Sequence, residues 1–475
     1  MIVLDARGKT PLHVQIFNRI RYDILAGKTA PGVKLPSARA LSVELSVSRN
    51  TVDLAYSRLS DEGFICGVPR VGYFVETGTA FRGGIPDEGG SSRASIDDVE
   101  DEGIRFDFRG EKVSSDDLSR TYWQRFVTKS LWEDGTEGMS RVEHFDDDYG
   151  LREEIRKYVY RFRGIECDSD MIFPAADARA CAELVCLSLK LSGAGARVGT
   201  ENPCRDRVRR VFRKNGFEVL PIELDKYGAT IESAVDSGAG TIWLTPSCQF
   251  PTAAVMPIER RENFAEWARR DGRIIVEDDS GCHYYYGRRP LPAIHSLIPE
   301  NVRYIGGLSD VLFPGGAVSW LILPKKAAAE LRGRLADNGP LAPFLIRHPL
   351  ELYMREGRLE SRLRKMRKRQ GAKRRALISA LGEVFEDRIF VSDTRSGLHV
   401  LVRAGWDADE SELVEQARRT GVAVCSTSQF WYNTADGVAG GGDSKRGATV
   451  LLHCGGVREE DIPGAVLLLR EVWKV

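Results

Sequence analysis

Residues 36–59 read PSARALSVELSVSRNTVDLAYSRL, and their pattern sets the fold of the N-terminal region. Two short helical patterns in this stretch are joined by a tight connection, and two short helices joined in this way form a helix-turn-helix. Ser48 stands where the second helix should begin, and a serine there can accept a hydrogen bond from the first helical turn. That turn would then present Arg49, Asn50 and Thr51.

The residues on either side complete a small domain. Apolar side chains recur at helical spacing between Leu12 and Ile24, so a longer helix is expected there. Residues 64–75 read as two short strands joined by a turn, which we interpret as a wing. The sequence therefore predicts a winged helix-turn-helix domain over residues 1–75.

Charge is unevenly distributed along the chain. The 475 residues include 68 Lys/Arg and 68 Asp/Glu, so the formal net charge is zero and any signal for a charged partner must be local. Residues 1–75 hold 10 basic and 6 acidic residues, a net charge of +4. Residues 76–105 hold 8 acidic residues, 3 basic residues and six glycines, which is typical of a flexible acidic linker.

The sequence also bears on the compartment. No apolar run approaches the roughly 18 residues that a membrane-spanning helix needs, so no membrane partner is expected. Nine cysteines without framework spacing suit a reducing compartment better than a disulfide-built secreted fold. We therefore predict a cytoplasmic protein.

From residue 106 onward, short apolar runs alternate with helical patterns. Buried strands are expected within residues 240–245, 272–278, 302–307 and 318–324, with a helix over 258–270. This alternation predicts an α/β domain with a largely parallel sheet. After residue 343 we expect one long basic helix over 350–381 and then strands near 389–391 and 398–403, which form a smaller α+β subdomain over about 340–475.

Six ordered blocks in the N-terminal region resemble the GntR-type winged helix. They are Pro-Leu-x-x-Gln-Ile from Pro11, Leu-Pro-Ser-x-Arg from Leu35, Val-Ser-Arg-x-Thr-Val from Val47, Ala-Tyr-x-x-Leu from Ala55, Glu-Gly-Phe from Glu62 and Gly-Tyr-Phe-Val from Gly72. The resemblance implies a double-stranded DNA operator as partner, with the second helix of the motif entering the major groove. The candidate DNA-binding residues are Lys34, Ser37, Arg39, Ser48, Arg49, Asn50, Thr51, Arg70, Gly72 and Tyr73. The alternative is that the arginines are ordinary surface residues of a three-helix domain.

A winged helix of this type followed by a linker and a large α/β body is the arrangement of MocR-like regulators. Several blocks of the body resemble theirs, including Tyr-Gly-Leu-Arg-Glu-Glu-Ile from Tyr149, Thr-Pro-Ser-x-Gln-Phe-Pro-Thr from Thr245, Glu-Asp-Asp from Glu277 and Glu-Gly-Arg-Leu-Glu-Ser-Arg-Leu from Glu356. The resemblance implies a fold-type I aminotransferase-like domain over residues 106–475. It also implies a homodimer, which in that family can be domain-swapped, and a small-molecule effector.

One loop departs from the aminotransferases that the body resembles. In those enzymes a lysine after a serine forms a Schiff base with pyridoxal phosphate (PLP), and an arginine after proline-glycine binds the phosphate. Here the loop reads Ser-Asp-Val-Leu-Phe-Pro-Gly-Gly-Ala from Ser309, with Asp310 at the place of the lysine and Ala317 at that of the arginine. A carboxylate cannot form a Schiff base, and it would repel a phosphate.

The other positions implied by the resemblance differ too, with one exception. Asp278 stands where a carboxylate pairs with the pyridine nitrogen of the cofactor. Asp177 stands in the phosphate-binding segment, and Arg205 replaces a stacking aromatic residue. Cys248 and Ser280 replace a histidine and a tyrosine. We therefore predict that PLP binding is lost and that the protein has no cofactor.

The residues expected around the former cofactor pocket are candidates for binding an effector. They are Asn202, Arg205, Cys248, Asp278, Ser280, Cys282, His283 and Asp310. The cysteines and the histidine could instead hold a soft metal or sense oxidants, but no spacing such as CxxC supports this, and no metal site is predicted.

These patterns favour a DNA-binding transcriptional regulator without enzymatic activity, whose body senses an effector other than PLP. The main alternative is a PLP-dependent regulator or aminotransferase that uses a lysine elsewhere in the chain. Lys325 and Lys326 follow the next expected strand at its far end and should point away from the site. A second alternative is a purely structural dimeriser without an effector.

Overall fold

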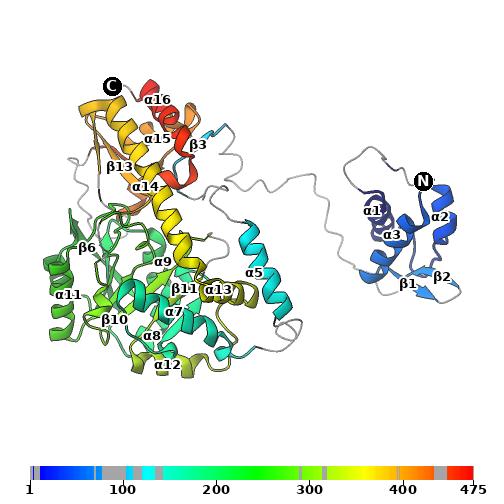
Figure 1. Cartoon of the computed structure of the whole chain (residues 1–475), viewed down its shortest axis with the longest axis horizontal. Helices are drawn as coiled ribbons and strands as arrows, with labels where there is room; N and C mark the ends of the chain where they lie inside the picture. The colour runs from blue at the N-terminus through cyan, green and yellow to red at the C-terminus, as the bar shows by residue number, and fades with distance from the viewer. Residues whose placement is uncertain are drawn as a thin grey trace. The chain divides into compact units, whose positions relative to one another are not determined.

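The structure is a computed structural model, and the chain falls into two compact units, Met1–Glu100 and Asp101–Val475 (Figure 1). It describes residues 4, 11–68, 71–76, 103–110, 120–133, 143–287, 291–312, 318–392, 394, 396–432 and 447–473. Most of the expected linker at residues 76–105 lies outside these ranges.

The N-terminal unit is a winged helix, as the sequence predicts. Three helices are followed by an antiparallel pair of strands: α1 (Leu12–Leu25), α2 (Ala38–Glu44), α3 (Arg49–Asp61), β1 (Ile65–Val68) and β2 (Gly72–Val75). The apolar faces of the helices meet in one core, in which Ile16, Val52 and Tyr56 are fully buried. The expected cap is present, because the Ser48 side chain accepts a hydrogen bond from the backbone N–H of Thr51 (3.2 Å).

Removing this cap should weaken α3. We expect Ser48→Ala to lower the local stability of the helix by about 1 kcal/mol, because the Thr51 N–H at the helix start loses its side-chain acceptor. Hydrogen exchange of the α3 amides in the full-length chain measures the change. The matched control is Ser57→Ala in the middle of the same helix, where the side chain is exposed. Equal acceleration of exchange in both variants would contradict a capping role.

The larger unit is built on an eight-stranded sheet. The strands run in the order β4 (Ile172–Ala175), β11 (Ser319–Ile322), β10 (Val302–Gly307), β9 (Ile274–Asp278), β8 (Thr241–Leu244), β5 (Arg197–Asn202), β6 (Glu218–Asp225) and β7 (Gly228–Ala229). The five strands from β10 to β6 pair in parallel, whereas β11, β4 and β7 are antiparallel to their neighbours. The prediction of a largely parallel sheet is confirmed.

Helices cover both faces of this sheet (Figure 1). Trp243 of β8 packs in a core with α8 (Ala178–Leu191), α9 (Asp206–Lys214) and α12 (Lys325–Leu335). Its neighbour Ile242 points to the opposite face and packs with α10 (Ile231–Asp236) and α11 (Ile258–Asp271). A third core on the side of β10 and β11 includes residues of α5 (Arg120–Glu133), α7 (Tyr149–Arg163) and α13 (Phe344–Arg355). Burial on both faces explains why the strands read as continuous apolar runs.

A smaller subdomain follows. Its four-stranded antiparallel sheet has the order β12 (Ile389–Val391), β13 (His399–Ala404), β16 (Thr449–His453) and β15 (Cys425–Ser426). The sheet packs with helices α14 (Arg358–Phe385), α15 (Glu410–Arg419) and α16 (Ile462–Val472). A further short parallel pair joins β3 (Phe106–Asp107) to β14 (Val422–Ala423).

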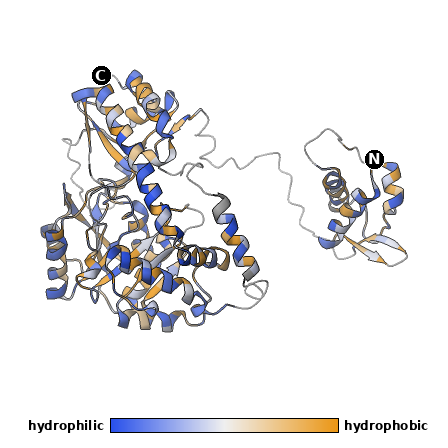
Figure 2. Cartoon of the chain, viewed as in Figure 1, coloured by the Kyte–Doolittle hydropathy of each residue, from blue (hydrophilic) through white to orange (hydrophobic). Residues whose placement is uncertain are grey.

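The prediction of one long helix over residues 350–381 was wrong. Two helices, α13 and α14, meet at Gly357, whose φ of +67° lies in the left-handed region that glycine adopts readily. Hydrophobic and hydrophilic residues both occur along α14 (Figure 2), in keeping with its buried Leu363 and Leu377 and its charged outer face. Within the described part of the chain, none of the helices has the length and apolar character needed to span a bilayer.

Candidate functional site

The first turn of α3 is the candidate recognition element of the winged helix. Because Ser48 caps the helix, the side chains of Arg49 and Asn50 stand at its N-terminal end and are exposed. Arg49 makes one contact within its helix, an ion pair between its Nε and Asp53 Oδ2 at 3.4 Å, and its side chain remains 70% exposed. Thr51 is half-buried, and its hydroxyl is hydrogen-bonded to Ser48 Oγ (2.8 Å). The arrangement leaves a guanidinium and an amide available to a partner.

The remaining candidate DNA-binding residues differ in their exposure and in their local contacts. Lys34 and Arg39 are exposed, so they are accessible to a partner, whereas Arg70 lies outside the described residues. Ser37 caps α2 by accepting a hydrogen bond from the N–H of Ala40 (3.1 Å). Gly72 has a φ of +134°, and a Cβ there would approach Lys34 Cε to 3.1 Å.

Tyr73 has a structural contact that the sequence did not indicate. Its ring packs edge-on against Tyr56 with the ring centroids 5.0 Å apart. Tyr56 in turn donates a hydrogen bond to the carbonyl of Pro36 (2.9 Å). The Tyr73 ring therefore helps to hold the wing against the helices.

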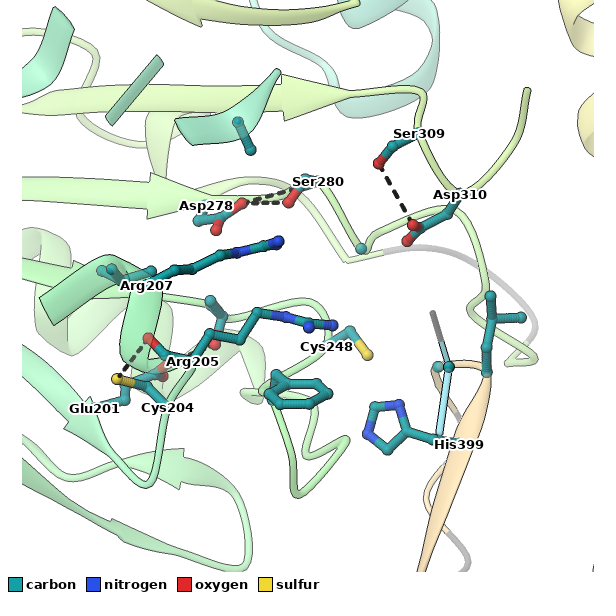
Figure 3. A pocket seen from close by; sticks show the side chains of 18 of the residues that line it. Glu201, Cys204, Arg205, Arg207, Cys248, Asp278, Ser280, Ser309, Asp310 and His399 are labelled. Atoms are coloured by element: carbon teal, nitrogen blue, oxygen red, sulfur yellow. Dashed lines mark hydrogen bonds between the residues drawn. The ribbon is translucent and has the colours of Figure 1, made fainter. Parts of the chain in front are cut away.

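The larger unit contains a cavity of about 170 Å³ at the carboxyl ends of β5, β8, β9 and β10 (Figure 3). This volume is far above the roughly 10–15 Å³ that one water molecule needs. The carboxyl ends of parallel strands are where open α/β sheets usually bind ligands. Its charged lining residues are Arg179, Arg205, Arg207, Glu201, Asp278 and Asp310. No lysine lines it in the part of the chain that the structure describes.

Two of the three carboxylates in the lining, Asp278 and Asp310, are held by local hydrogen bonds. Asp278 ends β9, and its Oδ1 accepts hydrogen bonds from Ser280 Oγ (2.5 Å) and Ser280 N (3.1 Å). Asp310 follows β10, and its Oδ1 accepts a long hydrogen bond from Ser309 Oγ (3.4 Å). Its backbone carbonyl accepts one from Tyr284 (2.6 Å). Burial raises the pKa of both carboxyl groups.

Two arginines face these carboxylates from the start of α9 (Figure 3). The guanidinium of Arg205 lies over the ring of Phe250, 3.7 Å from its centroid. Burial lowers the pKa of Arg205 to about 10, so its side chain is still charged at neutral pH. Arg207 is a site residue that the sequence analysis missed. The available signal was a second arginine two residues after Arg205, at the N-terminal end of the helix that Arg205 precedes as its N-cap residue.

The structure brings only some of the predicted pocket residues together. Cys248, Ser280, Asp278, Asp310 and Arg205 line the cavity. Asn202, Cys282 and His283 are absent from the lining.

These three residues support the fold around the site. Asn202 Oδ1 accepts a hydrogen bond from the N–H of Tyr432 (3.1 Å), and His283 Nε2 is hydrogen-bonded to the hydroxyl of Tyr158 (2.9 Å). Cys282 is buried, and burial raises its pKa. The described residues contain no cluster of His, Cys, Asp or Glu that could hold a metal ion, and the nine cysteines are all free.

Other positions of the expected cofactor site are absent from the cavity lining, although Asp177 directly precedes the lining residues Ala178 and Arg179. Asp177 caps α8, since its Oδ1 accepts a hydrogen bond from the N–H of Ala180 (2.7 Å). Lys325 and Lys326 begin α12 and do not line the cavity, and Lys325 pairs with Asp168 at 3.8 Å while its side chain is 86% exposed. Ala317 lies outside the described residues.

The winged helix matches a known family. The family described as "Bacterial regulatory proteins, gntR family" matches residues 12–75. Over nearly the full length, the chain is 27% identical to the HTH-type transcriptional regulator YdeL of Bacillus subtilis, covering 98% of this chain and 97% of that protein. It is 24% identical to the regulatory protein MocR of Rhizobium meliloti, with 91% and 90% covered. The chain is therefore similar to MocR-like regulators of the GntR type over nearly its whole length.

The structure of the body agrees with this similarity. The solved structure of LysN, an α-aminoadipate aminotransferase of Thermus thermophilus, superposes with a TM-score of 0.68 at 21% identity and covers 80% of this chain and 95% of that one. The likeness shows the fold of the MocR-like body, a fold-type I aminotransferase fold, as predicted.

The prediction that PLP binding is lost is contradicted. The chain is 26% identical to PdxR of Corynebacterium glutamicum, named as a pyridoxine biosynthesis transcriptional regulator, over 91% of this chain and 92% of that protein. The LysN structure holds N-(5'-phosphopyridoxyl)-L-leucine. Both findings point to PLP-related binding in this fold, and they contradict the prediction that the protein has no cofactor.

The residues present could make the noncovalent contacts that such a ligand needs. Asp278 could pair with a ring nitrogen, and Arg205 and Arg207 could bind an anionic group. They do not fit a covalent link at position 310, because the Asp310 side chain has no amine.

Proposed function

We propose that this MocR-like regulator binds a double-stranded DNA operator through its winged helix and that its body dimerises and senses a small-molecule effector. The observation that carries the DNA-binding part is the capped first turn of α3, where Arg49 and Asn50 are exposed. Arginine and asparagine are the side chains best suited to guanine and adenine edges in the major groove. A DNA partner would place the protein in the cytoplasm.

Two copies of the chain would suit this function. A two-fold homodimer presents two winged helices, which read two half-sites of an operator. We place the dimer contacts in the aminotransferase-like body, because the MocR-like family resemblance implies dimerisation there.

The effector is proposed to be related to PLP and to be held without a covalent bond. The charged cavity supports this, since it offers arginines for an anionic group and Asp278 for a ring nitrogen. The relationship to PdxR supports the chemical class. We propose a sensor and not an enzyme, because no described lysine lines the cavity to carry amine chemistry.

The DNA-binding proposal is tested by Arg49→Ala. The probe is a duplex that the full-length wild-type protein selects from a random-sequence library. Loss of one base contact should weaken binding by about 1–3 kcal/mol and relax the preference at one base position. A titration followed by gel shift measures both effects.

Arg19→Ala is the matched control for this experiment. Arg19 lies in α1 of the same unit and, like Arg49, pairs with an aspartate four residues later, Asp23 at 3.1 Å. The control therefore removes the same charge and the same kind of helix pair. Unchanged affinity of Arg49→Ala, or equal losses in both variants, would sink the assignment of α3 as the recognition helix.

A further inference from the structure

Two of the cavity's three carboxylates and two of its three guanidinium groups come together without forming ion pairs with one another. Asp278 and Asp310 approach from the strand ends, and Arg205 and Arg207 from the start of α9 (Figure 3). Among the described residues, no ion pair within 4.0 Å joins either of these carboxylates to either of these guanidinium groups. Both kinds of charge are therefore available to a ligand.

Asp310 is the carboxylate with the weaker local support. Its hydrogen bond from Ser309 is long (3.4 Å) and comes from a neutral hydroxyl, whereas Asp278 is held by two bonds from Ser280. Burial raises the pKa of Asp310, and the nearby Arg205 and Arg207 oppose this rise. A cation placed beside Asp310 would add a strong, charge-assisted hydrogen bond to a poorly solvated carboxylate.

A neutral group at the same place would gain much less. An aldehyde presents only a carbonyl oxygen, which cannot donate a hydrogen bond to a carboxylate and is repelled by its charge. A hydroxyl can donate one neutral hydrogen bond. A protonated primary amine donates three and also carries the opposite charge.

We propose that the cavity selects the amine form of a PLP-related ligand, with the protonated amine on Asp310 and the anionic group on Arg205 and Arg207. This inference rests on the proposed function, in which the cavity binds a PLP-related molecule. Asp310 thus determines the specificity of the cavity. In the related aminotransferases, a lysine at this position binds the aldehyde of PLP covalently, whereas Asp310 would bind the amine of the ligand without a covalent bond. Pyridoxamine 5'-phosphate has the required combination of groups.

Calorimetric titration of the full-length protein tests the selection directly. The probes are pyridoxamine 5'-phosphate and pyridoxine 5'-phosphate, which differ only in an amine against a hydroxyl and form no Schiff base with lysines. We expect the amine to bind roughly 10- to 100-fold more tightly, as one charge-assisted hydrogen bond implies.

The variant Asp310→Asn removes the charge and keeps the size of the side chain. It should abolish most of the preference by weakening the amine while leaving the affinity for the alcohol nearly unchanged. Asp271→Asn is the matched control, because Asp271 lies at the C-terminal end of α11 and is absent from the cavity lining. The control should keep the full preference.

The outcomes separate this inference from the proposed function. Equal affinity of the wild-type protein for the amine and the alcohol, or tighter binding of the alcohol, would overturn the amine selection and leave a PLP-related effector in place. Binding of neither probe would overturn both. Because the comparison of probes uses the wild-type protein, it remains decisive even if Asp310→Asn does not fold.

Discussion

Replacing Asp279 with alanine should lower the free energy of unfolding of the aminotransferase-like body by about 3–5 kcal/mol. Asp279 Oδ2 pairs with Arg163 Nε at 2.6 Å, and the two side chains are 0% and 2% exposed. The same oxygen accepts a hydrogen bond from the hydroxyl of Tyr304 (2.9 Å). The substitution would leave the guanidinium of Arg163 buried without its counter-charge. This uncompensated charge accounts for most of the free energy that is lost when a buried pair is broken.

Urea unfolding followed by tryptophan fluorescence measures this loss, because all eight tryptophans lie in the larger unit. The matched control is Asp271→Ala. Asp271 pairs with Arg270 at 2.9 Å at the end of α11, and this pair is largely exposed. Exposed pairs contribute little, so the control should unfold at nearly the wild-type urea concentration. Similar losses in the two variants would show that the buried pair has no special role in stability.

Replacing Asp310 with lysine should convert the cavity into one that captures an aldehyde covalently. The substitution puts an amine at the position where the related aminotransferases have their Schiff-base lysine, in a cavity that retains Asp278. Burial and the neighbouring Arg205 and Arg207 would lower the pKa of that amine, which increases its neutral, nucleophilic fraction. We expect PLP to be fixed to this residue on borohydride reduction.

Mass spectrometry of the peptide that contains position 310 measures the capture. The wild-type peptide should carry no adduct at that residue, because its side chain is a carboxylate. Asp271→Lys is the control, since it adds a lysine at the C-terminal end of α11, and residue 271 is absent from the cavity lining. No adduct on the Asp310→Lys peptide, or equal labelling of the control position, would mean that the cavity does not present residue 310 to a ligand.

Much of the fold could be read from local patterns. The helices and strands of the winged helix follow from apolar spacing, a serine cap and a short turn, all of which act over a few residues. The parallel strands were visible as apolar runs because both faces of the sheet are buried. The break between α13 and α14 was missed, because the basic and apolar pattern continues across Gly357 and a single glycine is tolerated in many helices.

The candidate site was only partly predictable. Asp278 and Asp310 could be placed through the resemblance, and both line the cavity. Cys282 and His283 follow Asp278 closely in sequence, yet they lie between the lining residues Gly281 and Tyr284 and are themselves buried near Tyr158 and Asp279. Proximity in sequence could not reveal this arrangement.

Residue chemistry and short-range periodicity were thus enough to establish the winged helix, the strand–helix alternation and the presence of a carboxylate at position 310. These patterns extend over only a few residues, so they can be recognised in the sequence without knowledge of the tertiary structure. Which charges meet across the cavity, and that they meet without neutralising one another, depends on how loops from separate strands pack. Asp278, Asp310 and the pair Arg205 and Arg207 come from three such segments, and folding alone brings them to one ligand-sized space.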